Sequence, residues 1–294
     1  MEIALSGVTK TYRGGKRVFD GLDLEIGEGM IGLLGANGAG KTTLMRMLTT
    51  VLKPTSGRIL VGGHDVTTRT GARAVKHILG YLPQELALYP ELTGAEFLDY
   101  IALLKGIGSK AERRRQTGDL LDQVGLAELA GERISTYSGG MKRRLGIAQA
   151  LLGDPDLLIV DEPTAGLDPH ERMRFRSLLA SLSGLRIVLL STHILDDVAQ
   201  SCPDVAVLAG GRLAYHGSTS GLTSAAAGHT YHVPPGVAVP PEATVVNAVT
   251  QTGSTDYRVV SPAPVPGARL VDPSLEDGYV ALLQNDSEDS AVAS

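Results

Sequence analysis

The segment Gly35–Thr43 constrains this chain more than any other, because it joins an apolar run to a helical segment through a glycine-rich loop. Its sequence is Gly-Ala-Asn-Gly-Ala-Gly-Lys-Thr-Thr, and the apolar run Met30–Leu34 comes directly before it. The glycines let successive backbone N–H groups turn toward a phosphate, and the following helix points the positive end of its dipole at the same place. The pattern predicts a site for the phosphates of a nucleoside triphosphate.

The polar residues of this loop have separate predicted roles. Lys41 can reach the β- and γ-phosphate oxygens, and Thr42 can coordinate Mg²⁺. The alternative is an ordinary turn in a chain that carries 36 glycines. The strand before the loop and the helix after it favour the phosphate site. The residues predicted to surround the phosphates are Gly35, Asn37, Gly38, Gly40, Lys41, Thr42 and Thr43.

A second apolar run, Leu157–Val160, ends in the two carboxylates Asp161 and Glu162. Asp161 at the carboxyl edge of a strand is a candidate Mg²⁺ ligand. Glu162 is expected to point elsewhere by strand alternation, where it can act on water as a general base. The alternative is a core strand that runs into a polar turn.

A third apolar run, Ile187–Leu190, is followed by Ser-Thr and His193. Ligands in α/β proteins bind beyond the carboxyl ends of such strands. His193 is therefore a candidate sensor of the γ-phosphate. The residues alone favour the alternative, a histidine at a strand end whose hydrogen bonds are satisfied within the protein.

The segment Tyr137–Met141 reads Tyr-Ser-Gly-Gly-Met and opens a helical pattern. Ser138 is the predicted N-cap, and Gly139 and Gly140 expose the first backbone N–H groups, so this helix end is a second candidate anion site. A single nucleotide has only one γ-phosphate. A dimer that pairs the loop of one copy with this helix end of the other would use both.

The order of apolar runs predicts an α/β fold with a largely parallel core sheet, because strand-like and helical segments alternate up to residue 216. Residues 85–150 interrupt this rhythm with helical patterns only, the first opened by a Thr93–Glu96 capping box. Beyond residue 217 the composition becomes rich in Ser, Thr, Ala and Pro, and short strand-like runs lead to a helical segment, Leu275–Leu283. We therefore expect a cassette at 1–217, a small α/β accessory domain at 218–284 and a disordered acidic tail at 285–294.

Charge, cysteine content and hydropathy exclude several classes of protein. The net charge is −5, and beyond residue 216 only Arg258 and Arg269 are basic. Such a surface lacks the basic footprint of a nucleic-acid-binding protein, so no nucleic-acid partner is expected. A single cysteine, Cys202, cannot form an internal disulfide and favours a reducing compartment. No stretch approaches the ~20 apolar residues of a membrane span and no signal peptide is evident, which predicts a cytoplasmic chain.

These motifs, in this order, resemble the ATP-binding cassette (ABC) transporter ATPases. The resemblance spans about residues 2–217 and rests on Tyr12, Gly35–Thr43, Gln84 within Tyr81–Glu85, Tyr137–Met141, Leu157–Glu162, Ala165–Asp168 and His193. It implies a P-loop ATPase core with an antiparallel β subdomain and an inserted helical subdomain, and ATP and Mg²⁺ as ligands. It also implies a head-to-tail dimer of two ATPase subunits.

The resemblance assigns a role to each matched residue. Tyr12 would stack on adenine, and Thr42, Gln84 and Asp161 would hold Mg²⁺. The side chains that would act on ATP from one subunit are those of Lys41, Thr42, Gln84, Asp161, Glu162 and His193. Ser138, Gly139 and Gly140 would act from the other subunit, and Asp168 would lie at the interface.

A narrower resemblance links the chain to bacterial daunorubicin-type drug and polysaccharide exporter ATPases. It rests on the phrase that begins at Tyr137 and on Pro273–Leu282 near the end of the chain. Tyr137 and Met141 depart from the commoner Leu and Gln of the family, which puts the polar contacts of the fifth residue in question.

The expected function is an ATP-hydrolysing subunit that drives a separately encoded membrane permease, most simply an exporter. Such a subunit would be peripheral on the inner face of the cell membrane. The alternatives are an importer ATPase and a soluble non-transport ATPase that acts on ribosomes or DNA. The apolar segment Leu86–Leu92 is expected either to dock the permease or to be buried under the helical subdomain.

Overall fold

A six-stranded sheet forms the centre of the molecule in the computed structural model, which describes residues 1–164, 167–182, 184, 186–251 and 254–292. The strand order is β10-β9-β3-β8-β7-β6, and all neighbours are parallel except β9 and β10. The predicted, largely parallel core sheet is therefore confirmed. Its strands are β3 (Gly29–Leu34), β6 (Leu79–Leu82), β7 (Leu157–Asp161), β8 (Ile187–Ser191), β9 (Asp204–Ala209) and β10 (Arg212–Ser218).

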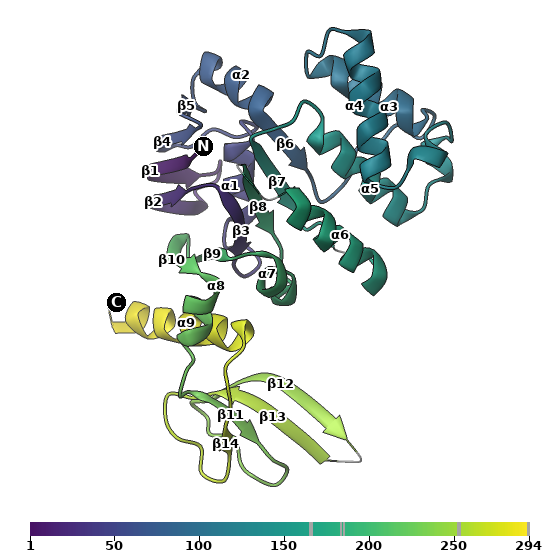
Figure 1. The fold of residues 1–294 in the computed structure, drawn as a ribbon. Helices are drawn as coiled ribbons and strands as arrows, with labels where there is room; N and C mark the ends of the chain where they lie inside the picture. The colour runs from purple at the N-terminus through teal and green to yellow at the C-terminus, as the bar shows by residue number, and fades with distance from the viewer. Residues whose placement is uncertain (165–166, 183, 185, 252–253, 293–294) are drawn as a thin grey trace.

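Helices and a second sheet cover this central sheet, so its inner strands are buried on both faces (Figure 1). Leu158 and Val160 of β7 pack into one core cluster, whereas Leu157 and Ile159 pack into another. This alternation is what the period of a strand dictates. The flanking helices are α1 (Lys41–Leu48), α2 (Arg69–Ile78), α6 (Pro169–Leu182) and α7 (Leu195–Ser201).

The second sheet is antiparallel, in the order β2-β1-β4-β5. It packs over α1 through buried side chains that include Phe19 and Leu44. Its strands are β1 (Ile3–Thr11), β2 (Arg17–Ile26), β4 (Ser56–Val61) and β5 (His64–Asp65). The hairpin between β1 and β2 places Tyr12 next to the first turn of α1, because the Tyr12 hydroxyl lies 3.2 Å from Thr43 Oγ1.

The segment between β6 and β7 forms the predicted helical subdomain. Figure 1 shows its helices, α3 to α5, grouped to one side of the central sheet. Thr93 and Glu96 form the predicted capping box, and Ser138 caps the last of these helices. Its elements are α3 (Gly94–Leu104), α4 (Lys110–Gln123), the short 3₁₀ turns η1 (Ala127–Leu129) and η2 (Ile134–Thr136), and α5 (Gly139–Leu151).

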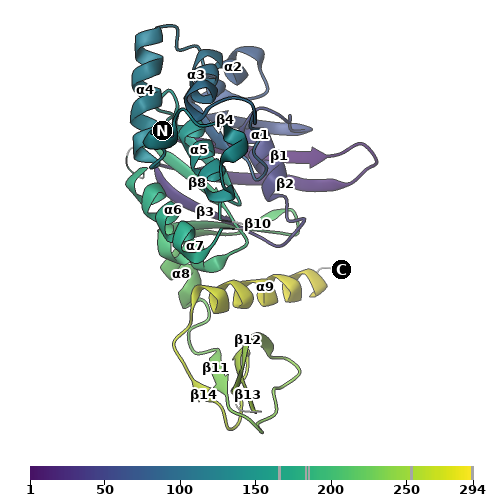
Figure 2. The same ribbon diagram turned by 90° about the vertical axis from the view of Figure 1, so that its right-hand side faces the viewer.

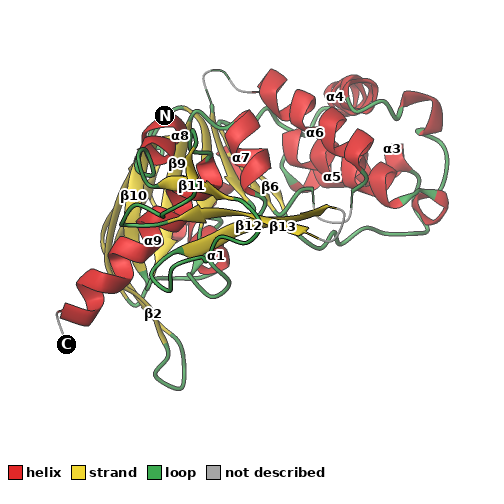
Figure 3. Cartoon of the chain, turned by 90° about the horizontal axis from the view of Figure 1, so that it is seen from below, coloured by secondary structure: helices red, strands yellow, loops and turns green. Residues whose placement is uncertain are grey.

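The C-terminal residues form a four-stranded antiparallel sheet and two helices. Figures 1 and 2 show α9 lying between this sheet and the rest of the molecule. Figure 3, from below, shows the strands β12 and β13 extending under the cassette. The elements are α8 (Thr219–Ser224), β11 (Thr230–Val233), β12 (Thr244–Gln251), β13 (Ser254–Val260), β14 (Arg269–Leu270) and α9 (Leu275–Val292).

The C-terminal helices share a core with the cassette. Leu222 of α8 and Leu275 of α9 belong to the same buried cluster as Val198 of α7. The division near residue 217 therefore falls within packed structure, since Ser218 still pairs in β10.

The last helix is longer than the sequence analysis predicts. We expected disorder from Asn285, but α9 runs on to Val292. Once a helix has begun, each further residue adds a hydrogen bond to an existing template, so an acidic, small-residue segment can extend a helix that it would not start.

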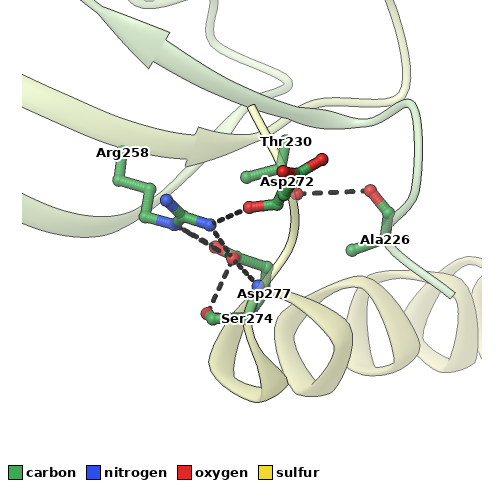
Figure 4. A network of polar contacts seen from close by, with 6 residues as sticks. All are labelled: Ala226, Thr230, Arg258, Asp272, Ser274 and Asp277. Carbon is green, nitrogen blue, oxygen red and sulfur yellow. Dashed lines mark hydrogen bonds and ion pairs between the residues drawn. The ribbon is translucent and has the colours of Figure 1, made fainter. Parts of the chain in front are cut away.

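Arg258 and Asp277 form an ion pair that joins β13 to α9 (Figure 4). Asp277 is fully buried. Its carboxylate accepts hydrogen bonds from Arg258 Nε and Nη2 at 2.6–3.0 Å, and from the backbone N–H and hydroxyl of Ser274. Burial alone would raise the pKa of Asp277, but the bonds from Arg258 and Ser274 outweigh it and hold the pKa below its ordinary value.

We expect this pair to make the stability of the C-terminal unit depend on pH. A carboxyl group with a lowered folded-state pKa stabilises the fold above its unfolded pKa of about 3.9, and that contribution is lost as the pH falls toward the folded value. Asp277→Asn should lower the free energy of unfolding by about 3 kcal/mol at pH 7, the low end for breaking a buried pair, because Arg258 is partly exposed. Urea denaturation followed by circular dichroism measures the change.

The difference between the Asp277→Asn variant and the unmodified chain should shrink as the pH falls from 5 toward 3. Asp256→Asn is the matched control, since Asp256 is a half-exposed carboxylate 3.5 Å from His232 on the same sheet. An equal loss for both variants, or one that does not change with pH, would contradict the assignment.

Candidate nucleotide-binding site

A cavity of about 620 Å³ lies at the carboxyl ends of β3, β7 and β8. It collects side chains from segments that are far apart in the sequence. The predicted site residues that line it are Tyr12, Asn37, Gly38, Gly40, Lys41, Thr42, Thr43, Gln84, Asp161, Glu162 and His193. This is the edge at which parallel sheets bind ligands.

The glycine-rich loop packs so tightly that side chains are excluded at two of its positions. A Cβ on Gly40, whose φ is +108°, would lie 2.5 Å from the Phe19 ring of β2. A Cβ on Gly35 would lie 2.6 Å from the carbonyl oxygen of Leu208 in β9. Gly40 is also the N-cap of α1, and no side chain caps that helix. The loop therefore presents backbone to the cavity, as a phosphate site requires.

Lys41 is the cation of the cavity. Its side chain is largely buried, and Nζ donates hydrogen bonds to the carbonyl oxygens of Gly35 and Ala36. Burial lowers the pKa of Lys41, although the charges of Glu162 and Asp161 act in the opposite direction. A positive charge thus lies close to both carboxylates.

Asp161 and Glu162 occupy different environments although they are adjacent in the chain. Asp161 is the buried last residue of β7, and burial together with the charge of Glu162 raises its pKa. Glu162 lies beyond the strand with φ +46°, a left-handed conformation that costs about 1–3 kcal/mol for a residue with a side chain. Its direction is therefore set by a turn, and our derivation from strand alternation was wrong.

His193 and Glu162 are in direct contact. His193 Nδ1 lies 2.6 Å from Glu162 Oε2, and the backbone N–H of Glu162 donates to the carbonyl oxygen of Ser191 at 2.8 Å. The turn after β7 is thereby attached to the end of β8. His193 is not an isolated histidine at a strand end, since it borders the cavity together with the acid that it contacts.

The segment Tyr137–Met141, which we call the signature segment and which opens α5, the signature helix, does not line this cavity. Ser138 Oγ accepts a hydrogen bond from the Met141 N–H at 3.2 Å, and the Met141 sulfur accepts from the Ser138 N–H at 3.4 Å. Met141 therefore completes the capping box that a polar residue would otherwise close. Gly139 and Gly140 border two other cavities, of about 430 and 390 Å³.

Asp168 is also outside the cavity. It is exposed, and its Oδ1 accepts a hydrogen bond from the Glu171 N–H at 2.8 Å in the first turn of α6. Ala165 and Gly166 of the same motif lie outside the described residues. One copy of the chain thus brings together most of the predicted site in one cavity, but Gly35, Ser138, Gly139, Gly140 and Asp168 do not line it.

Tyr12 borders the cavity beside the first turn of α1. Lys10 Nζ lies 5.4 Å from the centroid of its ring. Four further residues line the cavity although no motif indicated them as site residues: Lys16, Val18, Ala36 and Ser191. Lys16 and Val18 follow Tyr12 across the β1–β2 turn, so the turn signal Gly14–Gly15 could have identified them.

The fold and this cavity define a P-loop nucleoside triphosphatase: a glycine-rich loop between a central parallel strand and a helix, with acids at the end of a neighbouring strand. A family model described as ABC transporter matches residues 19–165. The chain belongs to the ABC transporter ATPases, ATP-hydrolysing subunits, as the motifs predicted.

The curated relatives include drug-resistance proteins. The daunorubicin resistance ATP-binding protein DrrA3 of Streptomyces coeruleorubidus is 40% identical over 77% of this chain and 71% of its own length. The daunorubicin/doxorubicin resistance ATP-binding protein DrrA of Streptomyces peucetius is 41% identical over 76% of this chain and 67% of its own length. The narrower resemblance to daunorubicin-type ATPases is confirmed.

Solved structures show the same cassette. An ATP-binding subunit of an ABC transporter superposes with a TM-score of 0.67 at 28% identity and covers 76% of this chain and 92% of its own. A dimeric cassette, MJ0796, bound to ADP and Pi gives a TM-score of 0.67 at 25% identity, over 74% and 98% of the two chains. Within the part of this chain that the structure describes, no helix has the length and apolar character needed to cross a membrane.

Replacing Lys41 tests the cavity as the phosphate site. Lys41→Ala removes a charge-assisted contact worth about 1.5–3 kcal/mol, so the Kd for ATP should rise about 10- to 100-fold. Isothermal titration calorimetry measures the affinity. Lys76→Ala, at an exposed position of α2, is the control and should bind ATP normally. A folded Lys41→Ala variant that binds ATP as tightly as the control would exclude Lys41 from the site.

Proposed function

We propose that this chain powers a separately encoded membrane permease, as an exporter ATPase for drugs, lipids or polysaccharide. The observation that supports this most directly is the half-site: the groups proposed for hydrolysis share one cavity, whereas Ser138, Gly139 and Gly140 do not line it. A second copy would supply the missing helix end. The dimeric form of a related cassette supports this arrangement.

In this proposal the loop Gly35–Thr43 binds the ATP phosphates, and Lys41 neutralises charge on the γ-phosphoryl group. Water attacks the γ-phosphorus while the Glu162 carboxylate takes its proton. The bond from phosphorus to the bridging oxygen breaks, and the products are ADP and phosphate. The contact from His193 Nδ1 orients the Glu162 carboxylate.

Mg²⁺ fits the oxygen donors that the cavity offers. Thr42, Gln84 and Asp161 line it together, and hydroxyl, amide and carboxylate oxygens are the ligands that this ion prefers. When bound there, the ion would neutralise phosphate charge. Burial and the charge of Glu162 raise the pKa of Asp161, and a cation bound beside it would stabilise its ionised form.

The proposed dimer gives the remaining site residues their roles. Ser138, Gly139 and Gly140 would bind the γ-phosphate of the ATP held by the partner copy, through the N-terminus of α5. Asp168 would lie between the copies, where its capping of α6 shapes the turn. Tyr12, which lines the cavity, would stack on adenine.

Residues 218–284 are proposed to be accessory. Among the residues of this part that the structure describes, none lines the nucleotide cavity. The unit packs on α7 and β10 instead, so its contribution would be to stability or to contact with the permease.

The segment Leu86–Leu92 is partly buried against the helical subdomain and partly exposed, so it has features of both the buried and the docking alternative. Leu88 is half-buried and packs against the helical core, whereas Tyr89 is 44% exposed. The Tyr89 ring packs edge-on against Tyr100, with centroids 5.8 Å apart. We propose that this face docks the permease, because it is an exposed aromatic surface beside Gln84 of the cavity.

The first test concerns hydrolysis. Glu162→Gln should still bind ATP but lose about 10²- to 10⁴-fold in kcat, the contribution of a positioned general base, and the ATP-bound dimer should accumulate. Steady-state kinetics and size-exclusion chromatography measure the two effects. Glu128→Gln, at an exposed position in η1, is the control. Near-normal hydrolysis by Glu162→Gln would remove this residue from the role of base.

The second test concerns the partner. Tyr89→Glu should abolish association with membranes that contain the permease while basal ATPase activity is kept. Val51→Glu is the control, because Val51 is 73% exposed at the end of α1. Insoluble Tyr89→Glu protein would indicate a core role instead.

Affinity capture from detergent-solubilised membranes identifies what the chain binds. A membrane-spanning permease supports the transport function, and its class distinguishes an exporter from an importer. Capture of ribosomes or DNA would overturn the proposal and the location at the inner face of the cell membrane.

A further inference from the structure

Arg143 is a buried arginine of α5 whose donors are all engaged. It is 8% exposed. An arginine has five N–H donors, and here each bonds a main-chain carbonyl oxygen. Nε donates to Pro163, Nη1 to Pro83 and Gln84, and Nη2 to Asp161 and Glu162, all at 2.9–3.0 Å.

The five acceptors lie where the neighbouring strands β6 and β7 end: Pro83 and Gln84 follow β6, Asp161 is the last residue of β7, and Glu162 and Pro163 follow it. Gln84, Asp161 and Glu162 place their side chains in the nucleotide cavity, whereas Arg143 does not line it. One guanidinium thus binds the backbone of both segments without itself lining the cavity. Because α5 begins directly after Ser138, the same side chain ties these segments to the signature helix.

The two bonds from Nη2 lie on either side of the strained residue. The carbonyl of Asp161 belongs to the peptide before the Glu162 Cα, and the carbonyl of Glu162 belongs to the peptide after it. Both peptide planes that define the conformation at φ +46° are therefore held. Such conformations persist only where the surroundings over-determine them.

We propose that Arg143 is a positioning residue for hydrolysis, which fixes the Gln84 loop and the Glu162 turn in the geometry that the reaction needs. The inference rests on the proposed role of Glu162 as general base. Electrostatics agrees with the placement: burial lowers the pKa of Arg143, while the nearby charges of Asp161 and Glu162 act to raise it. Arginine suits the position because a planar fork can reach five oxygens at once.

Arg143→Lys tests the proposal, since it keeps the charge but offers three donors from a single point. A general base displaced by about 1 Å costs on the order of 10²-fold in rate, so we expect kcat to fall about 10- to 100-fold. The phosphate loop makes no contact with Arg143 among its hydrogen bonds, so the Kd for ATP measured without Mg²⁺ should change less than about threefold. Arg143→Gln should show the same separation of kcat from Kd.

Arg113→Lys is the matched control. Arg113 is also an arginine that is 9% exposed, and its Nη1 also donates to two carbonyl oxygens, those of Ile107 and Gly108, but within the helical subdomain. It should lose stability without a selective loss of kcat. Steady-state kinetics, calorimetry of ATP binding and thermal denaturation on the full chain give the three quantities.

Three results would overturn the proposal: normal kcat in folded Arg143→Lys, a parallel loss of kcat and ATP affinity, or an equal loss of kcat in Arg113→Lys. Failure of both Arg143 variants to fold would assign the residue to stability and would overturn it as well. The Glu162→Gln variant separates the two claims. If that variant hydrolyses ATP normally, the role of Glu162 fails; if it is inactive while Arg143→Lys is normal, only the present inference fails.

Discussion

Two adjacent carboxylates at the end of one buried strand are the constraint on which the rest of the site depends. Asp161 and Glu162 are mostly shielded from water, and burial together with the neighbouring charge of Glu162 opposes the ionisation of Asp161. Two cations lie close enough to interact with these carboxylates: Lys41 at the end of the phosphate loop and Arg143 on α5. Neither cation forms a direct ion pair with them in the described structure, because Lys41 and Arg143 donate to main-chain carbonyls. The acids therefore remain available to water and to a metal ion.

The sequence was sufficient wherever a local pattern determines structure. The succession of strand and helix segments along the chain, the loop at Gly35–Thr43 and the caps at Thr93 and Ser138 each depend on a few neighbouring residues. A parallel sheet then gathers the ends of its strands at one edge, so placing Lys41, Asp161 and His193 at strand ends was enough to bring them into one cavity.

What the sequence did not show depends on contacts between distant segments. Arg143 donates to carbonyl oxygens of residues up to 60 positions away. Every residue has a main-chain carbonyl, so the sequence does not indicate which ones accept these bonds. The direction of Glu162 follows from its own left-handed backbone conformation after β7. A glycine at this position would have signalled such a turn in the sequence, but the residue is a glutamate. Its conformation is a product of tertiary structure, since Ser191 and Arg143 hold the backbone on both sides. Functional sites are where such departures from local rules are expected.

The C-terminal unit is attached to the cassette at α7, the helix that follows His193. Val198 of α7 shares a core cluster with Leu275 of α9, and the buried Asp197 beside it accepts hydrogen bonds from Thr164 and Arg176. Thr164 comes two residues after Glu162. A continuous set of packed and hydrogen-bonded groups therefore connects α9 to the turn that carries the proposed base. Each residue of this set is buried or hydrogen-bonded, so the structure shows a single packed arrangement. A conformational switch would need an element with two alternative arrangements. The C-terminal unit should consequently support the site by stabilising α7, and regulation through it would require a partner that binds a second arrangement of this helix.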